Sequence, residues 1–118
     1  MNDAISSHLP LPGASLHVLA ALAGGTKHGY AIMRQVEELT GGTVVMGPGT
    51  LYGTIKRLLE EGLIEEVEGD PEHDGIARRF YRLTGLGERV LAAETERLAR
   101  IVQGVRAQVG FRAIPGVG

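Results

Sequence analysis

The sequence predicts a mainly α protein with a small β-hairpin. Apolar residues recur at three- and four-residue steps in several stretches, which is typical of amphipathic helices. Glycines and prolines separate these stretches, and two short strand-like runs flank a polar, turn-rich segment. With 118 residues, 43% hydrophobic and 22% charged, the chain is long enough for one domain with a modest core.

The N-terminal part is predicted to contain an arm and one apolar helix. Residues 1–13 hold two prolines and no apolar periodicity, so they are expected to form a flexible N-terminal arm. Ser15 is predicted to cap a helix over residues 16–23, which are apolar almost all round. Such a helix is either buried or part of an interface. Gly24 and Gly25 end it.

Two amphipathic helices are predicted next. Residues 29–39 place their apolar side chains on one stripe and their charged side chains outside it, and 40–42 stop this helix. A third helix is expected to start at Pro48, because Gly47 suits a cap and proline suits the first helical position. Gly62 is expected to close it.

A hairpin and a long terminal helix are predicted to follow the three helices. Residues 63–68 and 77–83 read as the strands of a hairpin around a polar loop, 69–75. Thr84 is expected to cap a long terminal helix. This order is typical of a winged helix-turn-helix. It predicts a winged helix-turn-helix domain at 14–84, a C-terminal dimerisation helix at 85–110 and a frayed tail at 111–118.

Charge is sorted along the chain, although the net charge is only −2. Residues 60–74 hold many acidic side chains and no Lys or Arg, whereas residues 75–118 are rich in arginine. This segregation can form a basic face for nucleic acid or a set of internal ion pairs. The pI of about 6.1 disfavours a protein that coats nucleic acid without sequence preference, because such binding needs many phosphate contacts.

Several classes of function lack the residues they need. The chain has no Cys, which excludes disulfides, thiolate metal sites and cysteine nucleophiles and favours a cytoplasmic location. No basic start precedes Lys27, and no apolar run is long enough for a membrane span, so neither a signal peptide nor a membrane partner is expected.

Enzyme and metal motifs are also missing. The histidines lack metal-ligand spacing, and no nucleophile elbow or phosphate loop occurs, so no enzyme activity, cofactor or metal site is expected. The loop residues Asp70, His73 and Asp74 could at most hold a cation weakly.

The third helix carries the best candidate for a binding site. At 100° per residue, a buried face centred on Leu51, Ile55 and Leu58 leaves an outward face of Gly49, Gly53, Lys56, Arg57 and Glu60, flanked by Thr50, Tyr52 and Thr54. An exposed helical glycine costs about 1 kcal/mol relative to alanine, and close approach to another surface would explain Gly53. Free amides, hydroxyls and cations suit DNA. The alternative is that Lys56 and Arg57 are solvated residues paired with Glu60 and Glu61.

The second strand of the hairpin is a weaker candidate. Its arginines, Arg78, Arg79 and Arg82, alternate with aromatic residues and would suit a wing that grips the DNA backbone. The glutamates of the partner strand can pair with them instead. Internal pairing is favoured for Arg82, and both interpretations stay open for Arg78 and Arg79. The acidic loop at 70–74 should be repelled by phosphate.

The terminal helix is expected to mediate dimerisation. Its apolar stripe cannot be buried on so small a domain, and the first helix is apolar all round, so the two should meet across a twofold axis. The residues predicted at this contact are Leu16, Leu19, Leu91, Leu98, Ile101, Val102 and Val105.

Four motifs in order resemble the PadR family of bacterial transcriptional regulators. They are His28-Gly29-Tyr30, Gly47-Pro48-Gly49-Thr50-Leu51-Tyr52, Leu58-Leu59-Glu60-Glu61-Gly62-Leu63-Ile64 and Arg79-Phe80-Tyr81-Arg82-Leu83-Thr84. The resemblance covers about residues 16–98. It implies a homodimeric winged-helix repressor that binds inverted repeats upstream of its target genes. It also implies that the third helix is the recognition helix, with Thr50, Tyr52 and Lys56 at the DNA.

The sequence thus predicts a DNA-binding transcriptional regulator that acts as a homodimer on double-stranded DNA. The residues expected at the DNA are Gly49, Thr50, Tyr52, Gly53, Lys56, Arg57, Arg78 and Arg79. The alternative is a winged-helix module that binds a protein partner without DNA, which the pI and the acidic loop favour. A small-molecule effector is neither named nor excluded.

Overall fold

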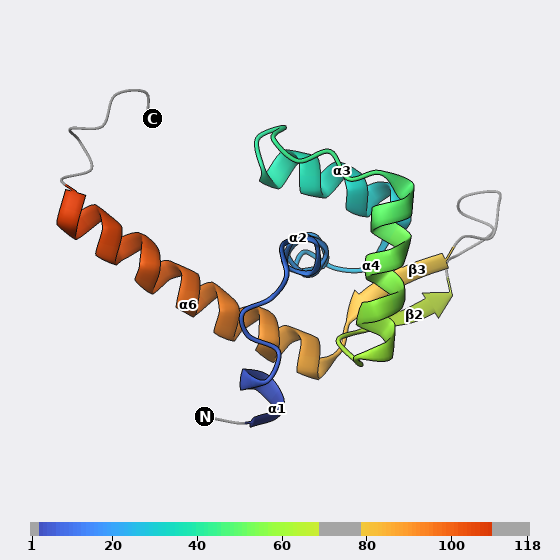
Figure 1. Cartoon of the computed structure of the whole chain (residues 1–118). Helices are drawn as coiled ribbons and strands as arrows, with labels where there is room; N and C mark the ends of the chain where they lie inside the picture. The colour runs from blue at the N-terminus through green and yellow to red at the C-terminus, as the bar shows by residue number, and fades with distance from the viewer. Residues whose placement is uncertain (1–2, 69–78, 110–118) are drawn as a thin grey trace.

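The computed structural model describes residues 3–68 and 79–109 and confirms the predicted fold class (Figure 1). It is mainly helical, with one small antiparallel sheet. The elements in chain order are α1 (Asp3–Ser6), α2 (Gly13–Leu22), β1 (Lys27–His28), α3 (Gly29–Leu39), α4 (Pro48–Glu60), β2 (Ile64–Glu68), β3 (Arg79–Leu83) and α6 (Gly85–Val109).

Helix α2 begins earlier than the sequence predicts. Pro12 is its N-cap residue, and the Pro12 carbonyl accepts the first helical hydrogen bond from the Leu16 N–H at 2.9 Å. The prediction that Ser15 caps this helix is therefore wrong. The fixed φ of Pro12 lets the helix start three residues sooner, which moves Ser15 into the helix, where it is buried.

Helices α3 and α4 begin and end close to where the sequence places them. His28 caps α3, because its Nδ1 accepts a hydrogen bond from the Ala31 N–H at 3.2 Å. Gly47 and Pro48 start α4. Gly62 follows its end at φ +74°, a left-handed conformation that glycine adopts readily and that terminates the helix.

The sheet contains the predicted hairpin and one strand that the sequence did not reveal. Strands β2 and β3 pair in antiparallel register, with Glu65 opposite Arg82. Strand β1 lies on the other side of β3, so the order is β1-β3-β2. A strand of two residues has no alternation that could be recognised in a sequence.

The hydrophobic core lies between α2, α3, α4 and the sheet, with α2 at its centre (Figure 1). The apolar stripes of α3 and α4 face this point, and β2 and β3 contribute the buried side chains of Ile64 and Tyr81. The largest apolar side chains buried there are Leu19, Ile32, Leu51, Leu58, Leu63 and Ile64.

The start of α6 is held tightly against the end of α4. The Thr84 hydroxyl accepts a hydrogen bond from the Gly87 N–H at 3.0 Å, as expected for a cap, and donates one to the Gly62 carbonyl at 2.6 Å. A Cβ on Gly87 would lie 1.9 Å from the Leu63 carbonyl oxygen. Only glycine therefore allows α6 to approach the backbone this closely.

The N-terminal segment is not the loose arm that the sequence suggests. Its residues 3–6 form α1, which contacts α6, and Ile5, Leu9 and Leu11 pack partly buried against the core. These apolar side chains follow no helical or strand period, so pattern analysis missed them. The Leu11 N–H also donates a hydrogen bond to Glu94 Oε2 at 2.9 Å.

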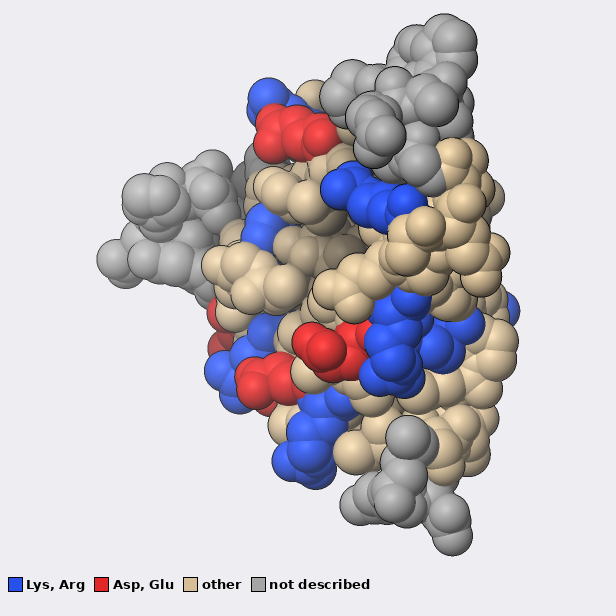
Figure 2. Space-filling model, turned by 90° about the vertical axis from the view of Figure 1, so that its left-hand side faces the viewer, with Lys and Arg blue, Asp and Glu red and all other residues tan. Residues whose placement is uncertain are grey.

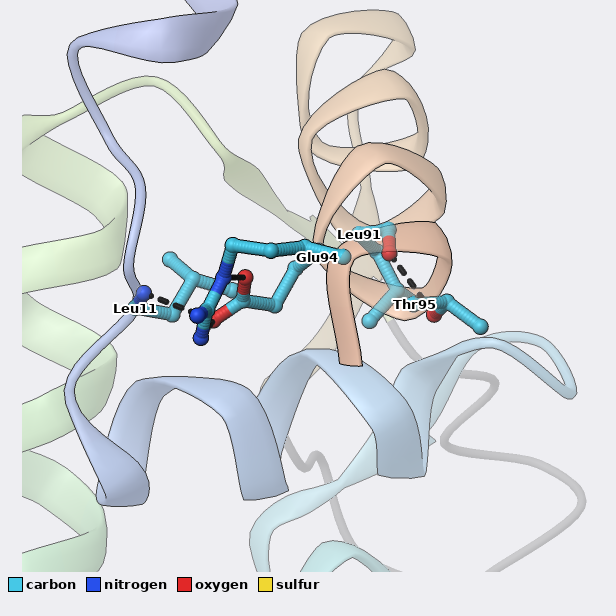
Figure 3. A network of polar contacts seen from close by, with 5 residues as sticks. Leu11, Leu91, Glu94 and Thr95 are labelled. Carbon is cyan, nitrogen blue, oxygen red and sulfur yellow. Dashed lines mark hydrogen bonds and ion pairs between the residues drawn. The ribbon is translucent and has the colours of Figure 1, made fainter. Parts of the chain in front are cut away.

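Glu94 is a buried carboxylate in the middle of α6 (Figure 3). Hydrogen bonds from the Arg97 guanidinium, at 2.5 and 3.1 Å, lower the pKa of the Glu94 carboxyl. Burial alone would raise this pKa, and the Leu11 N–H lowers it further. The carboxylate is therefore charged at neutral pH and joins the N-terminal segment to α6.

We expect this carboxylate to make the stability of the fold depend on pH. Because the folded-state pKa of Glu94 lies below its unfolded value, the stabilisation is complete above the unfolded value and is lost as the pH falls through the folded value. Thermal unfolding of the parent and of Glu94→Gln between pH 3 and pH 7 tests this. The parent should lose more stability than the variant as the pH is lowered. Equal losses would contradict it.

Candidate nucleic-acid interface

The helical phase predicted for α4 is confirmed. Leu51, Ile55 and Leu58 are buried, whereas the residues predicted to point outward, Gly49, Gly53, Lys56, Arg57 and Glu60, are all exposed. Thr50 and Tyr52 are exposed at the edge of this face. Thr54 differs, since it is buried and its hydroxyl donates to the Thr50 carbonyl at 2.7 Å.

Gly53 lies on an open part of the helix surface. A Cβ at this position would meet no atom within 4 Å. Packing within the described part of the chain therefore does not require glycine here, which agrees with the sequence argument that its absent side chain serves an approach from outside.

Arg57 has a structural contact that the sequence did not predict. One of its guanidinium nitrogens donates a hydrogen bond to the hydroxyl oxygen of Ser15 at 3.0 Å, and Ser15 is almost fully buried in α2. Arg57 thus joins α4 to α2. The contact was invisible in the sequence because the two residues lie 42 positions apart.

The hairpin arginines divide between the two interpretations that the sequence left open. Arg82 forms a 2.6 Å ion pair with Glu65, so the internal pairing favoured for it is confirmed. Arg79 pairs with Glu66 at 3.4 Å, yet its side chain is 80% exposed. Arg78 and the acidic residues at 70–74 lie outside the described residues.

Two tyrosines lie beside Arg79. Tyr52 of α4 and Tyr30 at the start of α3 are half-exposed or more, at 50% and 60%. Tyr30 was missed as a candidate because it precedes the predicted recognition helix. Tyr81 of β3 is buried. Its burial and the nearby Glu66 carboxylate raise the pKa of the Tyr81 hydroxyl, so this group stays protonated at neutral pH.

The residues predicted for dimerisation differ in their exposure in the single chain. Ile101, Val102 and Val105 are each about half exposed, and Leu16, Leu91 and Leu98 are half-buried. Leu19 is fully buried in the core of the single chain, so its assignment to this surface is wrong. An α2 that is apolar all round gave no indication of which side the core would take.

Charges are interspersed on the face toward which the C-terminal end of α6 points. Figure 2 shows Lys and Arg side chains next to Asp and Glu side chains there, with uncharged surface between them. A mixture of this kind does not favour phosphate binding, which leaves the α4 face as the better candidate.

Two further expectations concern metals and membranes. Within residues 3–68 and 79–109, no group of three or more His, Asp or Glu side chains could hold a metal ion. Asp70, His73 and Asp74 lie outside these ranges. In the same ranges, no helix is long and apolar enough to cross a membrane.

Comparison with known proteins identifies the family. Residues 18–93 match the family described as "Transcriptional regulator PadR-like family". The chain belongs to this PadR-like family. Its members are transcriptional regulators and not enzymes. This confirms the resemblance drawn from the four sequence motifs.

Two proteins of related sequence are similar to this chain. The transcriptional regulator Rv3488 of Mycobacterium tuberculosis is 38% identical over 92 residues, which cover 75% of this chain and 81% of the relative. An uncharacterised 37.1 kDa protein in a Streptomyces fradiae transposon is 39% identical over 88 residues, or 75% of this chain. The chain spans only 24% of the length of that second protein.

Solved structures show the same PadR fold. A PadR family regulator from Clostridium difficile matches with a TM-score of 0.71 and 24% identity, over 83% of this chain and 98% of that one. Bacillus subtilis PadR, solved in complex with operator DNA, matches with a TM-score of 0.61 and 24% identity, over 71% of this chain and 46% of that one. The winged-helix architecture is therefore the PadR architecture.

Proposed function

We propose that this PadR-family regulator binds duplex DNA through α4, as a homodimer on an inverted-repeat operator, and represses transcription. The observation that carries the proposal is the exposed face of α4, where Gly49, Gly53 and Lys56 point away from the core. A fold of the same kind binds operator DNA in Bacillus subtilis PadR. The helix can therefore enter a major groove with its N-terminal half close to the bases.

Gly53 and Lys56 have different parts in this proposal. The open surface at Gly53 lets the helix axis approach the base edges. Lys56, one turn along, supplies a positive charge for a phosphate or for a guanine edge. Arg57 orients α4 through Ser15 and contributes its charge only in part.

The proposed dimer rests on the apolar surface that the single chain leaves exposed. The second half of α6 carries Ile101, Val102, Val105 and Val109, each about half exposed. A groove lined by Leu22, Ala23, Leu91 and Ala92, among others, lies between α2, β3 and the first half of α6. In the proposed twofold arrangement the stripe of each copy packs into the groove of the other, because each copy offers both.

Lys56→Ala tests the DNA-binding face. The substitution should weaken binding to a duplex taken from upstream of the gene by about tenfold, since one charge-assisted contact is lost, and should leave the melting temperature unchanged because Lys56 is exposed. Fluorescence anisotropy at several salt concentrations measures the affinity.

The matched control is Arg100→Ala, which removes the same charge from an exposed position on α6. It should leave DNA affinity nearly unchanged. Equal affinity for the parent and Lys56→Ala would refute the assignment of this face. If the parent also showed no salt-dependent binding, the winged helix would be better explained as a module for a protein partner.

A further inference from the structure

A small hollow lies where α3 begins, beside α4 and β3. Its volume is about 350 Å³, and it is lined by His28, Gly29, Tyr30, Tyr52 and Arg79. Three elements that are distant in the sequence thus bring two phenols and a guanidinium to one place. The sequence suggested Tyr52 and Arg79 separately, as a helix residue and a hairpin residue, and gave no reason to join them.

Tyr52 reaches this hollow because Gly29 has no side chain. A Cβ on Gly29 would lie 2.3 Å from the Tyr52 hydroxyl oxygen and 3.0 Å from its ring carbon Cζ. The phenol therefore rests against the backbone at the start of α3. The tyrosine side chain is half exposed, so its hydroxyl can donate a hydrogen bond to a group that enters the hollow.

Positive charge lies on the same hollow. Arg79 is 80% exposed and is held by Glu66 at 3.4 Å, an exposed ion pair of the kind that contributes little and exchanges partners easily. The Arg34 guanidinium lies 5.9 Å from the centre of the Tyr30 ring and adds a second positive charge nearby. Guanidinium and hydroxyl donors together suit the oxygens of a phosphate group.

We propose that this hollow seats one backbone phosphate of bound duplex DNA. Arg79 leaves Glu66 to pair with the phosphate, and Tyr52 donates its hydroxyl hydrogen to a second phosphate oxygen. The proposal rests on the proposed function, since it extends the DNA contact from α4 to the base of the hairpin. A phosphodiester fits better than free phosphate, because the hollow is open and adjoins the exposed α4 face.

The test compares variants on two duplexes of equal length, one with the inverted repeat and one with a scrambled sequence. Arg79→Ala should lose about tenfold in affinity on both duplexes, and its salt slope should fall by about one unit, because one phosphate contact is removed. Tyr52→Phe should lose roughly threefold on both with an unchanged slope, because it removes a neutral donor.

Two further variants complete the test, one expected to raise the affinity and one that serves as a control. Glu66→Gln should raise affinity about threefold on both duplexes, because it releases Arg79 and removes a negative charge. Arg89→Ala removes a positive charge from an exposed position on α6 and should change affinity little. Equal affinities for the parent and Arg79→Ala, or a loss confined to the inverted repeat, would overturn the proposal while leaving DNA binding by the protein intact.

Failure of the proposed function is recognised separately. If the parent bound neither duplex, inorganic phosphate would be titrated into the protein while the NMR signals of the Gly29 and Tyr30 amides are followed. Saturable shifts in the parent that are lost in Arg79→Ala would retain the hollow as a phosphate site and assign it to a free anion. Unshifted signals would remove it.

Discussion

Gly87→Ala should lower the stability of the fold by about 3 kcal/mol, or roughly 10 to 15 °C in melting temperature. The added methyl group would lie 1.9 Å from the Leu63 carbonyl oxygen and 2.9 Å from the carbonyl carbon. Both are backbone atoms, fixed by the end of α4 and the start of β2, so neither can rotate away. Helix α6 would have to move away from the domain, which would break the hydrogen bonds of the Thr84 hydroxyl.

Gly104→Ala is the matched control for this substitution. It lies in the same helix, is exposed, and a Cβ there would meet nothing within 4 Å. It should stabilise the helix by up to about 1 kcal/mol, because alanine has the higher helix propensity. Thermal unfolding followed by circular dichroism measures both. A Gly87→Ala protein as stable as the parent would show that α6 is less closely docked than described.

Val102→Asp should weaken the proposed homodimer by about a hundredfold or more. Val102 is half exposed in the single chain, so the fold tolerates the change. Because of the twofold axis, the substitution occurs in the interface twice, once from each subunit. Loss of one central apolar contact costs about 2 kcal/mol, and the burial of an unpaired carboxylate adds to this cost. Sedimentation velocity between 1 and 100 μM would then detect monomers.

The control for this charge is Gln103→Asp. Gln103 is the next residue along the exposed part of α6, and one step of about 100° turns its side chain away from the apolar stripe. The dimer should persist in this variant. Dissociation by both substitutions would point to a general effect of charge on α6, and an unaffected Val102→Asp dimer would place the interface elsewhere.

Local patterns in the sequence predicted most of the fold. The apolar stripes of α3 and α4 and the glycines that end them located both helices, and the hairpin followed from strand-like runs around a polar loop. Features set by distant contacts could not be predicted this way. Strand β1 exists because Lys27 and His28 meet Tyr81 and Phe80, and only the folded chain brings them together.

The candidate site divides in the same manner. Helical periodicity alone located the exposed face of α4, including Gly53 and Lys56. The same reasoning could not tell that Arg57 reaches back to Ser15, or that Leu19 faces inward. An arginine side chain is long enough to contact a residue beyond the face of the helix on which it lies. The sequence of a helix that is apolar on every side does not indicate which side packs into the core.

The hydrogen bond between Arg57 and Ser15 connects the helix that binds DNA in the proposed dimer, α4, to a helix at the subunit contact, α2. Ser15 is adjacent in α2 to Leu16, which the sequence predicts at the contact with the second copy. A small rotation of α2 at that contact therefore shifts the anchor of α4 as well. In a symmetric pair, the distance between the two α4 helices must match successive major grooves, about 34 Å apart. Anything that wedges or tightens the subunit contact would thereby retune the half-site spacing that the protein accepts.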